Sequence, residues 1–153
     1  MTEPDRADPP PPHTTPAAPQ QYPRPAAHIG VVRIEATLEG PVALGGLRTF
    51  LRDASSLVGL ESSETLVVIT HELVKNAEAL GESGIKVAVQ RTPVGGARIE
   101  VRDHGYGIPT VDARPLALGL RIVEELSDRW GVDQFLPGKI VWAERDPDST
   151  RAA

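Results

Sequence analysis

Hydrophobic residues recur along this chain with two different periods, which mark the expected strands and helices. Apolar and polar residues alternate, or β-branched residues cluster, over 29–37, 85–90, 97–102, 132–136 and 139–144, and this predicts strands. Apolar residues recur at spacings of three and four over 42–58, 64–80 and 115–130, and this predicts amphipathic helices. Turns at 92–96 and 137–138 join neighbouring strands. We therefore expect two antiparallel hairpins.

One acidic residue lies at a position where the alternating pattern predicts a buried side chain. Asp103 follows the alternating strand in phase with Val101, so its carboxylate is expected to face the core. Burying a carboxylate without a partner is costly. Gly105 and Gly107 come next and allow another group to approach the backbone closely. The stretch therefore points to a bound ligand.

Two polar residues of the helix expected at 64–80 have the spacing of a shared site. Glu72 and Asn76 are four residues apart, so they lie on one face of the helix, beside its apolar stripe. Taken alone, such a pair is also typical of an ordinary solvated helix face. His71, in the same helix, is expected at the surface. Gly119 lies in the first turn of the next helix, where free backbone N–H groups and the helix dipole favour phosphate.

Composition sets the first 28 residues apart from the rest. They hold nine of the 15 prolines, and Tyr22 is their only Phe, Trp or Tyr. Because proline fixes φ and removes a backbone donor, we expect 1–28 to be a disordered or polyproline-like tether. A Pro-rich recognition segment is the alternative. The folded domain is expected over 29–145, followed by a polar, disordered tail at 146–153.

Charge and residue usage exclude several function classes. The net charge is −5 with no basic block, which argues against direct binding to nucleic acid. The absence of cysteine excludes disulfides and thiolate metal sites, and the four histidines lack zinc-site spacing. No apolar run approaches the roughly 20 residues of a membrane span, and the start lacks the pattern of a secretion signal. We expect a cytoplasmic protein that does not bind membranes.

The order of these motifs resembles a known family. The motifs are Glu72-x-x-x-Asn76, Asp103-x-Gly105-x-Gly107, Gly119-Leu120 and the closing strand Gly138-Lys139-x-Val141-Trp142. Together they resemble the GHKL superfamily of gyrase, heat-shock chaperone, histidine-kinase and mismatch-repair ATPases, over nearly all of 29–145. Segments 72–77, 120–123 and 128–131 are most similar to the anti-sigma-factor serine/threonine kinases and related actinobacterial ATP-binding regulators.

The resemblance implies an α+β fold, a two-layer sandwich in which a mixed, mostly antiparallel sheet is covered on one face by about three helices. It also implies that ATP is bound with Mg²⁺ held by Asn76, while Asp103 accepts the adenine amino group. Gly105 and Gly107 would let the base and ribose approach the backbone. Gly119 and Leu120 would present amide groups to the phosphates.

In this resemblance Glu72 is the catalytic residue, which orients or deprotonates the attacking hydroxyl. The first functional hypothesis is a serine/threonine kinase that sequesters a sigma factor and phosphorylates its antagonist. The second is a sequestering module of the same fold with weak or no nucleotide turnover. Two departures favour it: Ala117 replaces a phosphate-loop glycine, and Ile140 replaces a threonine that often supports the aspartate.

Two further points concern assembly. A histidine kinase would need a dimerising helical hairpin with a phospho-accepting histidine, which the Pro-rich residues 1–28 cannot supply. The family resemblance favours a homodimer. The identities of the sigma factor and the antagonist are not encoded in any motif of the chain.

Overall fold

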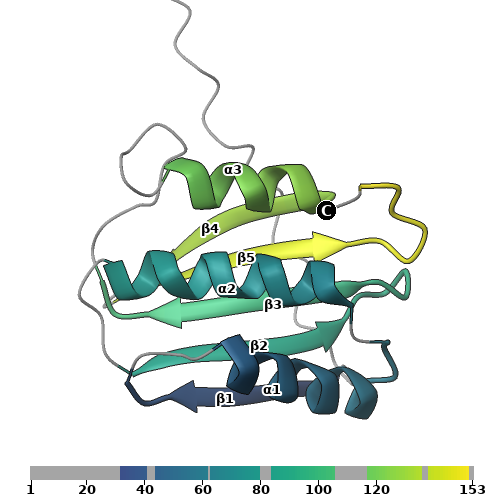
Figure 1. The fold of residues 1–153 in the computed structure, drawn as a ribbon, viewed down its shortest axis with the longest axis horizontal. Coiled ribbons are helices and arrows are strands. Elements are labelled where there is room, and N and C mark those ends of the chain that lie inside the picture. The colour runs from purple at the N-terminus through teal and green to yellow at the C-terminus, as the bar shows by residue number, and fades with distance from the viewer. Residues whose placement is uncertain are drawn as a thin grey trace, which may run out of the picture.

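A five-stranded antiparallel sheet forms one layer of the protein, and three helices form the other (Figure 1). The structure, a computed structural model, describes residues 32–40, 44–61, 63–79, 84–105, 117–135 and 138–151. Its elements in chain order are β1 (Arg33–Leu38), α1 (Leu44–Leu57), α2 (Glu64–Ala79), β2 (Ile85–Arg91), β3 (Ala97–Asp103), α3 (Ala117–Leu126), β4 (Arg129–Phe135) and β5 (Gly138–Arg145). The N-terminal segment 1–28 and Gly107, one of the expected site residues, lie outside the described residues.

The strand order is β1-β2-β3-β5-β4, and every pairing among the described strands is antiparallel. The expected mixed sheet is therefore corrected to a wholly antiparallel one. The reason is the connections: α1 and α2 together return the chain to the end of the sheet where β1 finished, so β2 runs back along β1. Likewise α3 and β4 together bring the chain back beside β3.

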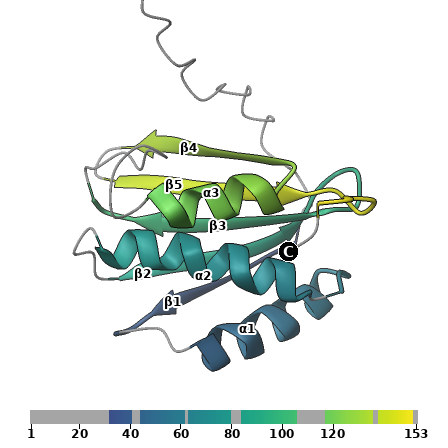
Figure 2. The same cartoon turned by 45° about the horizontal axis from the view of Figure 1, so that its top comes forward.

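The core lies between the sheet and the helices, which all cover the same face (Figures 1 and 2). Alternate strand residues turn toward the helices, as the period of two requires. The buried residues from the strands include Val87, Val89, Ile99, Val101 and Val141, and those from the helices include Leu47, Leu51, Ile69, Leu73 and Val123. Among the described helices, none is long and apolar enough to cross a membrane.

The third helix is shorter than the sequence pattern predicted. It ends at Leu126, and Trp130 and Gly131 belong to β4 instead of continuing the helix. The Ser127 backbone N–H and hydroxyl both donate to the Val123 carbonyl and close the last turn. A Cβ at Gly131 would lie 2.8 Å from the Trp142 ring, so only glycine lets this ring lie across β4. Pairing with β5 therefore overrides the helical period.

The chain after β5 returns to the end of α3. The Asp146 N–H donates to Asp128 Oδ2 at 2.8 Å, and the Ser149 hydroxyl donates to Asp128 Oδ1 at 3.1 Å. The Arg151 guanidinium donates to the Glu124 carbonyl at 3.0 Å, near the negative end of the helix dipole. These contacts hold residues 146–151 against the end of α3.

The face of the sheet away from the helices carries a ladder of charges. Glu100 accepts hydrogen bonds from Arg33 and Arg98, and Arg98 also donates to Glu144 at 2.9 Å. The Arg98 guanidinium stacks over the Trp142 ring, 4.3 Å from its centroid. Burial opposes the ionisation of Glu100, but the hydrogen bonds from the two arginines outweigh it and lower the pKa of Glu100.

This lowered pKa gives a testable pH dependence. A carboxyl whose pKa is lower in the folded state stabilises the fold above its unfolded pKa, and the contribution is lost as pH falls through the folded pKa. We expect Glu100→Gln to lower the free energy of unfolding by about 2 kcal/mol at pH 7. The difference from wild type should shrink below about pH 4. Urea unfolding at several pH values measures it, and a deficit that does not change with pH would contradict the assignment.

Candidate functional site

The residues singled out from the sequence gather at one end of the sheet. The C-terminal half of α2, the end of β3, the start of β5 and the start of α3 all lie there, at the left in both views (Figures 1 and 2). Asp103 is the last residue of β3, and the register places Lys139 of β5 opposite it. Elements distant in the sequence thus place the candidate residues at the same end of the sheet.

Glu72, Asn76 and Gly119 meet where α3 crosses close to α2. A Cβ placed on Gly119 would lie 2.7 Å from Glu72 Oε2 and 3.5 Å from Asn76 Oδ1. The expected one-face arrangement of Glu72 and Asn76 is therefore confirmed, since both approach the same glycine. The sequence predicted Gly119 only as a source of phosphate-binding amides. Its lack of a side chain also lets the two helices approach at this point.

Glu72 and Asn76 differ in their surroundings. The Glu72 side chain is 15% exposed, and its oxygens lie 3.7 Å from His71 Nδ1 and 3.7 Å from Lys75 Nζ. Asn76 is buried, with 5% of its surface exposed, and its Nδ2 has no hydrogen-bond partner among the described residues. A buried amide without a partner is costly. This position therefore has the capacity to bind a further polar group.

Asp103 is buried as expected, with 1% of its surface exposed, but it already has a cationic partner. Its Oδ1 accepts hydrogen bonds from Lys139 Nζ at 2.7 Å and from the Gly105 N–H at 2.8 Å. Its Oδ2 is buried and has no partner within the described chain. The argument that the whole carboxylate needs a ligand is corrected accordingly, because only Oδ2 lacks a partner.

Sequence reasoning missed Lys139, although a signal was present. Lys139 is in phase with Val141 and Ala143, two buried residues of β5, so alternation alone places it on the core face. A lysine at such a position needs an anionic partner. The register supplies one, because Lys139 lies directly across from Asp103.

Ile140 does not occupy the place that the resemblance suggested for it. It pairs with Arg102, and both of these residues are on one face of the sheet while Asp103 is on the other. A hydroxyl at position 140 would therefore not reach the Asp103 carboxylate. The residue that supports Asp103 from β5 is Lys139.

The remaining expected site residues are placed as follows. Leu120 is buried in the core with 0% of its surface exposed, next to Gly119 in the first turn of α3. Ala117 is the first residue of α3, and its side chain lies outside the described part of the structure. No group of three or more His, Asp or Glu residues that could hold a metal occurs in the described ranges.

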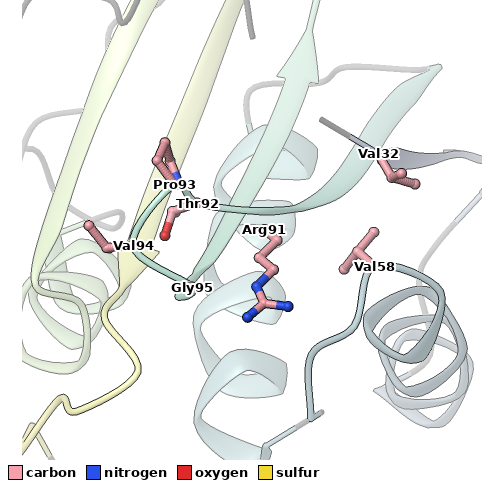
Figure 3. Close-up of a pocket in the computed structure, with 7 residues that line it drawn as sticks. All are labelled: Val32, Val58, Arg91, Thr92, Pro93, Val94 and Gly95. Carbon is pink, nitrogen blue, oxygen red and sulfur yellow. The ribbon is translucent and has the colours of Figure 1, made fainter. Parts of the chain in front are cut away.

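A separate hollow lies at the other end of the sheet, beside the turn between β2 and β3 (Figure 3). It is lined by Val32, Val58 and residues 91–95. The Arg91 guanidinium donates to the Gly59 carbonyl at 3.4 Å. None of the residues expected to bind nucleotide lines this hollow, so it is distinct from the candidate site.

Comparison with known proteins adds no assignment to this geometry. A scan against protein-family models finds no match, and a search of the curated proteins finds no significant match.

Proposed function

We propose that this chain is an ATP-binding regulatory protein of the GHKL type, acting as an anti-sigma factor and serine/threonine kinase. In this proposal it sequesters a sigma factor and phosphorylates the antagonist of that sequestration, in the cytoplasm and as a homodimer. The observation that supports it best is the meeting of Glu72, Asn76 and Gly119 at the same end of the sheet as the half-satisfied Asp103. The three helices on one face of the sheet support this type of fold, whereas the wholly antiparallel sheet departs from the mixed one that the resemblance implied.

The residues present fit a bound adenine nucleotide. Asp103 Oδ2 is a buried acceptor without a partner in the described chain, as the amino group of adenine requires. Gly119 lets the Glu72 carboxylate lie against the start of α3, where a Cβ would come within 2.7 Å of Glu72 Oε2. The Asn76 carboxamide would hold Mg²⁺, which when bound would supply neutralisation of phosphate charge.

Glu72 has the surroundings of a residue that receives or orients a proton. Its carboxylate is partly exposed beside the Gly119 backbone, where the attacking hydroxyl of a protein serine or threonine could reach it. Lys75 Nζ and His71 Nδ1 each lie 3.7 Å from one of its oxygens. Phosphoryl transfer asks mainly for positioning, charge neutralisation and a base, and these residues supply each role.

A sequestering module with little turnover is the second candidate, and two observations favour it. Ala117 stands at a position where the family usually has glycine. In addition, the Lys139 ammonium already neutralises Asp103, which lowers the gain from binding a ligand there. Nucleotide binding and phosphate transfer must therefore be measured separately.

The test of nucleotide binding is a calorimetric titration of the full chain with Mg-ATP, Mg-ADP and Mg-GTP. We expect the adenine nucleotides to bind and the guanine nucleotide to bind more weakly. Asp103→Asn should weaken adenine-nucleotide binding by about 1–3 kcal/mol, because it replaces the charged acceptor of a buried hydrogen bond. Asp133→Asn, which removes a carboxylate on the other face of the sheet, is the matched control. Equal binding of ATP and GTP, unchanged by Asp103→Asn, would contradict the adenine assignment.

The close approach at Gly119 gives a second prediction. A Cβ at this position would displace the end of the flexible Glu72 side chain, while alanine improves helix propensity by about 0.5–1 kcal/mol. We expect Gly119→Ala to keep the free energy of unfolding within about 1 kcal/mol and to lower phosphate transfer about 10²-fold. Gly46→Ala in α1, where a Cβ meets nothing within 4 Å, is the control. Transfer at the wild-type rate by Gly119→Ala would remove Glu72 from the site.

A further inference from the structure

Lys139 is the largest fully buried side chain in the described residues, with 2% of its surface exposed. Lysine is almost never buried to this extent unless its ammonium is paired. Here the pairing is direct, since Nζ lies 2.7 Å from Asp103 Oδ1 and 3.5 Å from the Gly105 carbonyl. The Lys139 side chain therefore contacts both Asp103 and Gly105.

The hydrogen bonds of the pair are distributed unevenly. Asp103 Oδ1 accepts two, from the Lys139 ammonium and from the Gly105 N–H. The other carboxylate oxygen, Oδ2, is buried without a partner in the described chain. Both donors hold the same oxygen, so the carboxylate is fixed in one orientation and its second oxygen remains an acceptor.

A purely structural ion pair would not be expected to have this form. Buried ion pairs are often no more stabilising than apolar residues of the same volume. Native proteins also satisfy nearly all buried polar atoms. A pair that leaves one carboxylate oxygen buried and unpartnered has instead the arrangement of a binding group.

We propose that Lys139 is a positioning residue for nucleotide binding, which orients the Asp103 carboxylate and leaves Oδ2 to accept one neutral N–H group, the exocyclic amino group of adenine. This inference rests on the proposed function, because it assumes that the site binds a purine nucleotide. Since Lys139 already neutralises the carboxylate, a cationic ligand gains little from it. Selectivity then depends on the single hydrogen bond to Oδ2.

The experiment compares two ligands on the full chain by calorimetry: Mg-ATP and the triphosphate of purine riboside, which lacks the amino group. Wild type is expected to prefer ATP by at least about 10-fold, because the analogue leaves Oδ2 without a partner. Lys139→Met should reduce this preference to within about 3-fold. Without Lys139 the carboxylate loses one of the two donors that hold Oδ1 and is free to turn, so Oδ2 is no longer held ready for the amino group that only ATP carries.

A general loss of folding would lower the affinity for both ligands by the same factor and leave their ratio unchanged. The loss of a positioning residue would change the ratio. Lys86→Met makes the same substitution on the opposite face of the sheet, where Lys86 pairs in register with Arg102, and should keep the wild-type ratio. If Lys139→Met does not fold or binds neither ligand, Asp103→Asn with Lys139→Met removes both charges. That double variant is expected to bind the two ligands within about 3-fold of each other.

The outcomes distinguish the inference from the proposed function. A wild-type preference for ATP that survives in Lys139→Met or in the double variant overturns the inference alone. So does a folded double variant that binds neither ligand, because the inference assigns selectivity and not the whole affinity to the pair. Equal binding of both ligands by wild type also overturns it while leaving nucleotide binding intact. If wild type binds neither ligand, the inference and the proposed function both fail.

Discussion

Lys139→Met is expected to lower the free energy of unfolding by about 3–5 kcal/mol, the range typical of a buried ion pair that loses one partner. The reason is that the Asp103 carboxylate, with 1% of its residue surface exposed, would keep its burial and lose its counter-charge. Replacing both residues, with Asp103→Leu and Lys139→Met, should leave stability within about 1 kcal/mol of wild type or raise it. Urea unfolding of wild type, Asp103→Leu, Lys139→Met and the double variant measures the effect.

The two single variants, the double variant and wild type form a double-mutant cycle. The cycle measures the coupling free energy between Asp103 and Lys139. Strong coupling means that the two charges depend on each other in the folded state. Lys86→Met, which removes an ammonium 3.5 Å from Glu35 at the surface, should change stability by less than about 1 kcal/mol. Single substitutions with small and additive effects would show that the two charges do not depend on each other in solution.

The positions of strands and helices were largely readable from the sequence because hydrophobic period and core face coincide in most of this chain. The exception is Trp130, whose spacing continues the helical stripe of α3. Trp130 and Gly131 nevertheless belong to β4, because β5 offers a pairing partner and Gly131 accommodates the Trp142 ring. The sequence predicted this hairpin only from residue 132, because the local spacing of Trp130 favours a helix.

The candidate site was predictable in parts for a similar reason. Asp103 and the spacing of Glu72 and Asn76 follow from local periodicity, so their side was predicted correctly. The contact of Gly119 with α2 and the pairing of Lys139 with Asp103 depend on how separate elements pack. Strand phase would have placed Lys139 on the core face, whereas the partner of that lysine required the strand register.

Glu72→Ala should separate the two proposed functions most sharply. If Glu72 orients or deprotonates the attacking hydroxyl, it acts more on the transition state than on bound ATP, so its loss should lower the rate and leave binding nearly unchanged. We expect Mg-ATP affinity to stay within a few-fold, while transfer of labelled phosphate to an antagonist serine or threonine falls by about 10²–10⁴. Asn76→Ala should impair both, because the proposed metal ligand is lost with the carboxamide.

The structure offers a close control for this experiment on the same helix. Glu64→Ala removes a carboxylate at the other end of α2, where it pairs with Arg48 at 2.9 Å on the exposed surface. Such a fully exposed pair contributes little to stability, so both binding and transfer should stay at the wild-type level. A wild-type protein that binds a sigma factor tightly but transfers no phosphate to any antagonist would refute the kinase. The sequestering module would then stand, and Glu72 would be one of the solvated polar residues of α2.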